Sequence, residues 1–165
     1  MALTSNKNYL QPTGFKLIID RKNYGNLEYF AQSVTHPGAT VQPLELAIPR
    51  ITSIPLVGDA IDYGQLEANI ILDEDMTSYR EMQRWLDRIV NEGQVNENPA
   101  NGSVIPTYAD ITLLILSSHN NKTVQVKYND CMPVTLGSIE FASNVSDVTY
   151  LTFSVSFRFT TFEIS

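Results

Sequence analysis

The chain has 165 residues, of which 43% are hydrophobic and 18% are charged, and its formal net charge at pH 7 is −7. This length suits a single domain, residues 1–165, that can bury about 70% of the surface exposed by the unfolded chain. The negative charge repels a phosphate backbone and argues against tight nucleic-acid binding, while one cysteine, Cys131, excludes an internal disulfide.

The first third of the chain predicts two strands followed by a projecting ribbon. The segments "GFKLIID" (14–20) and "LEYFAQSVT" (27–35) alternate between apolar and polar residues, and turn residues separate them, which predicts a hairpin. From 36 to 65 the prolines exclude central strands, because proline cannot donate to a sheet ladder. Apolar residues persist in this ribbon, and we expect other subunits to cover the following ones: Leu46, Ile48, Ile51, Ile54, Leu56 and Val57.

One helix is expected in the middle of the chain. "LEANIILDE" (66–74) predicts a strand, after which apolar residues recur every three or four positions and predict a helix at about 75–92. Acidic residues at 73–75 favour the start of that helix, since they complement its dipole. Trp85 lies on the apolar stripe, and we interpret it as part of the core instead of a cofactor pocket.

The last third predicts strands again, after a polar loop at 94–108. The segments are "ADITLLILSS" (109–118), "KTVQVKYNDC" (122–131), "LGSIEFAS" (136–143) and a long terminal strand from 150. In the terminal strand, apolar Phe153, Val155 and Phe157 alternate with polar residues, which predicts one buried face and one wet face. The residues of the wet face are Thr152, Ser154, Ser156 and Arg158.

No pattern of residues predicts catalysis, a cofactor site or a metal site. His36 and His119 lie far apart in the sequence, and Cys131 has no evident base partner, so it is interpreted as a small buried residue. Glycine-rich phosphate motifs and a serine nucleophile elbow are also missing. We therefore predict a structural protein and not an enzyme, with a ligand-binding β-sandwich such as a carbohydrate-binding module as the alternative from another class.

Several segments in a fixed order resemble the tail tube protein family of contractile-tailed bacteriophages, which shares its fold with type VI secretion tube proteins. The resemblance covers residues 14–160 and rests on five stretches: "GFKLIID" with "LEYFAQSVTHPGA", then "IPRITSIPLVGDAIDYGQLEANIILDED", and finally "MPVTLGSIEFAS" with "VSDVTYLTFSVSFRF". It implies a mainly β fold, a two-sheet antiparallel β-sandwich or partial barrel with one flanking helix.

The resemblance also implies an assembly. Six subunits would form a ring whose joined sheets make an inner β-barrel, and stacked rings would make a tube for genome passage during ejection. A baseplate ring protein that initiates the tube is the alternative within the same fold. The implied partners are other copies of the chain, the tail sheath, and baseplate or terminator proteins, with double-stranded DNA passing without sequence-specific binding and no membrane binding.

Within such a tube, the wet face of the terminal strand is expected to line the lumen, which would be polar and on balance acidic, with a solvent-exposed outer sheet as the alternative. Arg158 opposes that balance: it either pairs across the subunit boundary with Glu140 or Asp147, or it stays unpaired and repeats as a ring of six positive charges that bind DNA. The apolar ribbon at 43–60 is expected to contact the next ring or the neighbouring subunit, or else to fold back over its own core. The first 14 residues lack the apolar core of a signal peptide, so we expect assembly in the host cytoplasm and a final place in the virion tail.

Overall fold

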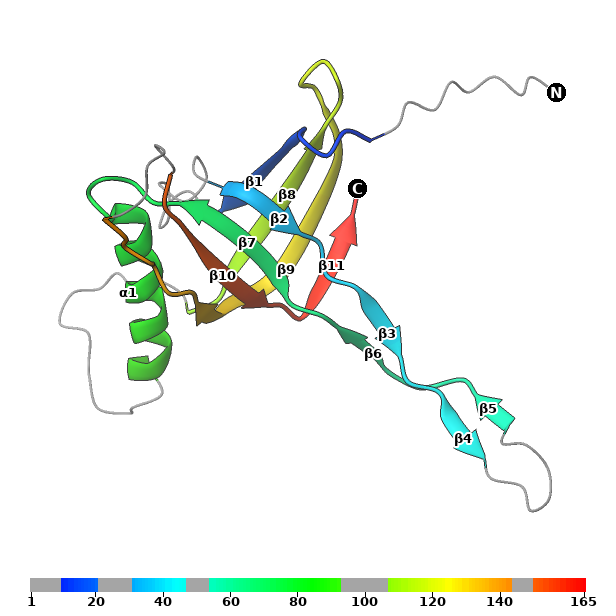
Figure 1. Ribbon diagram of the computed structural model, residues 1–165. Helices are drawn as coiled ribbons and strands as arrows, with labels where there is room; N and C mark the ends of the chain where they lie inside the picture. The colour runs from blue at the N-terminus through cyan, green and yellow to red at the C-terminus, as the bar shows by residue number, and fades with distance from the viewer. Residues whose placement is uncertain (1–9, 21–30, 47–53, 93–106, 144–149) are drawn as a thin grey trace.

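The computed structural model describes residues 10–20, 31–46, 54–92, 107–143 and 150–165, and these form strands and one helix (Figure 1). The mainly β fold with one helix that the sequence predicts is confirmed. The elements in chain order are β1 Phe15–Ile19, β2 Ala31–Thr35, β3 Ala39–Val41, β4 Leu44–Leu46, β5 Ile54–Leu56, β6 Ile61–Tyr63, β7 Leu66–Ile71, α1 Thr77–Glu92, β8 Ala109–Leu116, β9 Lys122–Leu136, β10 Thr152–Arg158 and β11 Thr161–Ile164.

The long strand β9 belongs to two antiparallel sheets. The first sheet contains β1, β8, the N-terminal part of β9 and β11, and the second sheet contains the C-terminal part of β9 with β10, β7 and β2. Asp130 lies between the two parts and has a φ of 53°, beside an irregularity in the pairing of β8 with β9. A bulge of this kind bends a strand, which allows β9 to pass from one sheet to the other.

The core lies between the two sheets. Every second residue of β10 is buried, namely Phe153, Val155 and Phe157, because strand side chains alternate between faces. Leu17 of β1 and Ile111 of β8 face them from the first sheet as members of the same buried cluster. The expectation that the apolar positions of the terminal strand are buried is therefore confirmed.

Helix α1 covers one side of this core. Trp85 and Met82 are fully buried, which confirms that Trp85 belongs to the core, whereas Val90 at the edge of the apolar stripe is exposed. The Trp85 indole N–H donates to the backbone oxygen of Thr107 at 2.7 Å, and its ring lies 5.9 Å from that of Phe157. The indole N–H therefore has a partner although the side chain is buried.

Asp73 holds the start of α1. Its carboxylate accepts hydrogen bonds from the backbone N–H of Thr77 at 2.9 Å and from both the N–H and the hydroxyl of Ser78, at 3.1 and 2.6 Å. Met76, just before the helix, has a φ of 52°. The acidic residues expected to favour the helix start thus act chiefly through capping by Asp73, and the helix begins at Thr77, two residues later than predicted.

The proline-rich segment forms a ribbon of paired strands, β3 with β6 and β4 with β5, which extends away from the two sheets (Figure 1). This confirms the predicted projecting ribbon. A Cβ at Gly58 would lie less than 3.0 Å from the carbonyl oxygen of Gln42, so glycine is required where the ribbon changes from one strand pair to the next. Ile48 and Ile51 lie outside the described residues.

Three local expectations are wrong. Strands β1 and β2 do not form a hairpin, because β1 pairs with β8 and β2 pairs with β7 in the other sheet. Residues 137–143 form no strand, since β9 extends to Leu136 and already occupies the place beside β10. The terminal strand is two strands, because the chain leaves β10 after Arg158 and β11 then pairs with the N-terminal part of β9.

Candidate functional site

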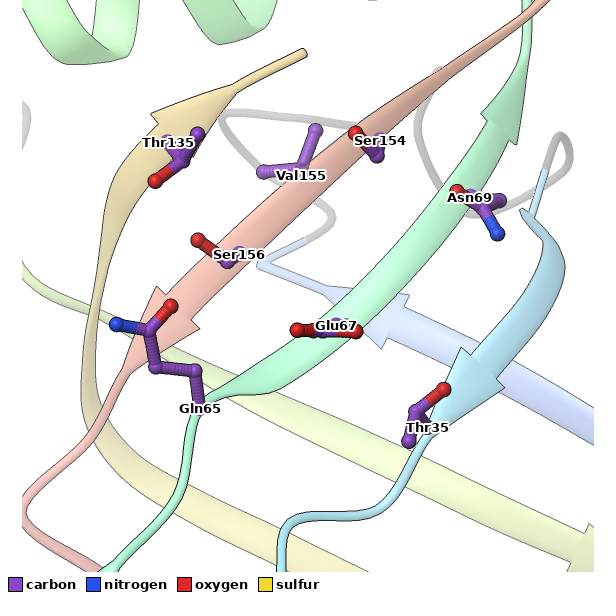
Figure 2. Close-up of a pocket in the computed structure, with 8 residues that line it drawn as sticks. All are labelled: Thr35, Gln65, Glu67, Asn69, Thr135, Ser154, Val155 and Ser156. Atoms are coloured by element: carbon purple, nitrogen blue, oxygen red, sulfur yellow. The ribbon is translucent and has the colours of Figure 1, made fainter.

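The second sheet carries a polar face that crosses four strands (Figure 2). It arises because polar residues of these strands alternate with the buried ones and so share the opposite side of the sheet. The register places two rows of polar residues side by side, one of four residues and one of three. The first row is Thr35, Glu67, Ser156 and Thr135, and the second is Ser33, Asn69 and Ser154.

This polar face is hollowed. A concavity of about 290 Å³ lies over it, and Gln65, just before β7, contributes to its lining together with the first row and with Asn69 and Ser154 of the second row. The Asn69 amide donates to the Ser33 hydroxyl oxygen at 2.9 Å, which links β7 to β2. The Ser156 hydroxyl is buried and has no hydrogen-bond partner in the part of the chain that the structure describes.

The polar face carries charge at Glu67, in the concavity, and at Arg158, at the end of β10. Among the described residues that line the concavity, only Glu67 is charged, and its side chain is exposed. Arg158 is exposed at the end of β10, where it lies opposite Met132. Glu140 lies in the irregular segment after β9 and not in the predicted strand at 136–143, and its pairing with Arg158 across a subunit boundary stays a prediction. Asp147 lies outside the described residues.

The predicted wet face of the terminal strand lies on the side opposite the core. Ser154 and Arg158 are exposed, while Thr152 and Ser156 are half-buried. Sequence reasoning missed that β7, β2 and β9 extend this face. The alternation of Glu67 and Asn69 with buried neighbours was a usable signal, but the register across four strands is not visible in the sequence.

The ribbon presents exposed apolar side chains. Of the residues predicted to make contacts, Leu56 is 43% exposed and Val57 is 91% exposed. Leu46 and Ile54 lie in the paired strands β4 and β5. Val41 and Ile61, which face each other in β3 and β6, are also exposed and were not among the predicted contact residues.

Within the described ranges, no group of three or more His, Cys, Asp or Glu side chains could hold a metal ion. Cys131 is buried, as predicted, and burial raises the pKa of its thiol to about 12. His36 lies with its Nδ1 2.6 Å from the hydroxyl oxygen of Tyr128, a buried residue whose pKa is raised by desolvation. In the described part of the chain, no helix is long and apolar enough to span a membrane.

Comparisons with known proteins show the same architecture. A chain of the cryo-EM structure of the anti-feeding prophage baseplate matches with a TM-score of 0.68 at 10% identity, over 98% of this chain and 97% of that chain. A chain of the sheath-tube complex of the extracellular contractile injection system PVC matches with a TM-score of 0.66 at 12% identity, over 97% and 93%. The crystal structure of an Hcp protein gives 0.54 at 11% identity, over 92% and 98%. No curated protein sequence matches this chain significantly.

At these identities the solved structures establish the fold. The family model described as phage tail tube protein matches residues 2–165, almost the whole chain. That match includes every stretch on which the sequence resemblance rests, so the predicted family is confirmed. The chain belongs to the phage tail tube protein family.

Proposed function

We propose that this chain is the structural subunit of a contractile phage tail tube, in which six copies form a ring and the rings stack. The observation that carries the proposal is the hollowed polar face across β2, β7, β10 and β9 in a member of the tail tube family. In the ring, this face lines the lumen and includes the predicted residues Thr152, Ser154, Ser156 and Arg158. The opposite face of the same sheet already packs on the core of the subunit. The wall of the lumen therefore needs no further layer of protein behind this sheet.

Two facts support a ring of six with a passage for DNA. The anti-feeding prophage baseplate, which contains a similar chain, was solved with six-fold symmetry. One Glu67 per subunit becomes a ring of six carboxylates, which repels phosphates and so prevents DNA from adhering during ejection. The hydroxyl and amide groups of the face keep the lumen wet, while Arg158 adds one positive charge per subunit at the end of β10.

The ribbon makes the contacts between subunits or between rings in this proposal. Leu56 and Val57 are exposed apolar residues on an element that extends from the body, which supports this role. The proposed contact surface also includes Leu46, Ile48, Ile51 and Ile54. Exposed apolar side chains favour association, because a contact removes them from water. The gain in free energy is about 25 cal/mol per Å² of buried apolar surface.

The other partners are the tail sheath and a baseplate or terminator protein, and the place of the protein is the virion tail after assembly in the host cytoplasm. Solved structures of a sheath-tube complex, a baseplate and a tube-terminating cap each contain a similar chain. A baseplate ring that initiates the tube is therefore the second candidate, favoured by the similarity to the baseplate chain. In both roles the protein is structural and not an enzyme.

Negative-stain electron microscopy of the purified protein tests the proposal. We expect six-fold rings with a central channel, alone or stacked into tubes, at more than one salt concentration. Uniform monomers at every salt concentration and protein concentration would overturn it. Decoration of the tubes by co-expressed sheath protein then separates a main tube subunit from a single initiating ring.

A further inference from the structure

The ribbon leaves the second sheet at a root formed by residues 36–38 and 63–64. Its strands β3 and β6 continue from β2 and β7, which already pair with each other (Figure 1). Between the two ladders, the backbone N–H of Gly64 donates to the carbonyl oxygen of Gly38 at 2.9 Å. A two-stranded ribbon has little stability of its own, so its direction depends on what its root packs against.

Aromatic side chains pack at this root. Two of them belong to the root itself, because His36 follows β2 and Tyr63 ends β6. Three come from the body of the protein: Tyr128 lies in the N-terminal part of β9, Phe159 follows β10, and Phe162 lies in β11. We call these five residues the root cluster. Through it, a ribbon that continues from the second sheet also packs against strands of the first sheet.

Phe162 contacts both strands of the root. Its ring centre lies 5.1 Å from that of His36 and 5.3 Å from that of Tyr63, and both pairs meet edge to face, at 88° and 71°. Aromatic rings prefer this arrangement, which restricts their orientation as well as their distance. Phe159 adds a second contact with Tyr63 at 5.7 Å. The C-terminal part of the chain therefore holds the ribbon from one side.

Tyr128 joins the root through its hydroxyl. The residue is fully buried, and desolvation raises the pKa of its hydroxyl, which therefore keeps its proton at neutral pH. The Nδ1 of His36 lies 2.6 Å from the hydroxyl oxygen, and the described part of the chain offers that oxygen no other partner. Donation from Tyr128 to Nδ1 gives the buried hydroxyl its acceptor. Loss of His36 would leave the hydroxyl buried and unpaired, which costs stability.

We propose that the root cluster sets the direction of the ribbon, with Phe162 as the main packing contact and the hydrogen bond from Tyr128 to His36 as the polar contact. These are positioning residues, because they act through the strands on the exposed apolar residues Leu56 and Val57. The strand β11 thereby decides where the apolar surface of the ribbon points. The consequence for assembly rests on the proposed function, whereas the direction of the ribbon in a single chain does not.

Distances within one chain test this positioning. Spin labels are attached at Asp59→Cys on the ribbon and at Thr123→Cys in β9, both exposed positions, and labelled chains are diluted into an excess of unlabelled protein. Cys131 is buried, so it does not react with the label in the folded protein. Double electron–electron resonance should give one narrow distance distribution for the labelled chain and a broad one when Phe162→Ala is added. The yield of rings in the microscope should fall with Phe162→Ala.

Tyr79→Ala is the matched control. Tyr79 is half-buried like Phe162 and meets Phe153 edge to face at 5.3 Å, but it lies on α1 and outside the root cluster. We expect it to lower the unfolding midpoint about as much as Phe162→Ala does, while the distance distribution stays narrow. A narrow distribution in Phe162→Ala, or equal broadening in both variants, would overturn the proposal. A broad distribution with rings in normal yield would uphold the positioning and contradict the ribbon contacts of the proposed function.

A double-mutant cycle tests the hydrogen bond. His36→Phe keeps an aromatic ring beside Phe162 but leaves the Tyr128 hydroxyl without its acceptor, and the further change Tyr128→Phe removes that hydroxyl. The double variant is therefore expected to unfold at a higher urea concentration than His36→Phe alone and to have the narrower distance distribution. An equal or lower unfolding midpoint would show that the hydroxyl does not depend on His36, and it would overturn this part of the proposal.

Discussion

Gly137 donates its backbone N–H to the carbonyl oxygen of Ser154 at 2.7 Å, and a Cβ on Gly137 would lie less than 3.0 Å from the Ser154 hydroxyl. This contact fixes the chain where β9 ends against β10. Gly137→Ala is therefore expected to destabilise the fold by about 1–3 kcal/mol, as for other overpacked sites. Urea denaturation followed by circular dichroism measures the change.

Gly38→Ala is the matched control, because nothing lies within 4 Å of a Cβ at Gly38. We expect its unfolding midpoint to stay within experimental error of the unmodified protein. Equal stability of both variants would show that the chain relaxes around residue 137 without cost.

The capping of α1 by Asp73 predicts a dependence of stability on pH. Burial raises the pKa of Asp73, but hydrogen bonds from Ser78 and Thr77 outweigh that effect and hold the pKa well below its usual range. A lowered folded-state pKa stabilises the protein above the unfolded value of about 3.9, and this stabilisation is lost as the pH falls from there toward the folded pKa. Asp73→Asn should reduce this fall in the free energy of unfolding at acidic pH, the acid limb of the stability curve. Denaturation experiments from pH 7 to pH 2 measure it.

Asp73→Ala tests the cap itself, with an expected loss of about 0.5–2 kcal/mol at pH 7. Glu74→Gln, at an exposed neighbour, serves as the control and should keep both the stability and the acid limb. An unchanged acid limb in Asp73→Asn would assign the pH dependence to other carboxylates.

The exposed apolar residues of the ribbon predict an assembly mutant. Replacing both Leu56 and Val57 with Asp should leave a folded subunit with an unchanged circular dichroism spectrum, but without rings or tubes in the microscope. Size-exclusion chromatography with light scattering gives the mass. Val90→Asp, at a residue 64% exposed on α1, is the control and should retain rings. Loss of folding in the double variant would mean that the ribbon packs on its own chain.

The charge of residue 67 is predicted to decide whether the lumen retains double-stranded DNA. Glu67→Lys replaces six carboxylates per ring by six ammonium groups, and such rings should retain double-stranded DNA at low salt and release it as salt rises. Unmodified rings should not retain it. Glu163→Lys makes the same charge change on β11 in the first sheet and should behave like the unmodified protein. Equal retention by both variants would contradict a lumen lined by the polar face.

Much of this architecture could be predicted from the sequence, because alternation and proline positions act locally. The buried face of β10, the ribbon and α1 follow from such patterns. The partners of β1 and β2 could not be predicted, since turn residues between two strands do not decide which edge each strand joins. The polar face was found only in part, because Glu67 and Thr135 join Ser156 through a register that involves strands far apart in the chain.

Because β9 is one backbone in two sheets, the layers of this protein are connected covalently as well as by side-chain packing. A mechanical load on the polar face passes along β9 into the first sheet. Sliding of one layer past the other would have to break ladders at both ends of that strand together, and cooperative rupture needs a larger force than the sequential loss of single bonds. Each subunit is therefore stiff against shear by itself, without contacts to neighbouring subunits.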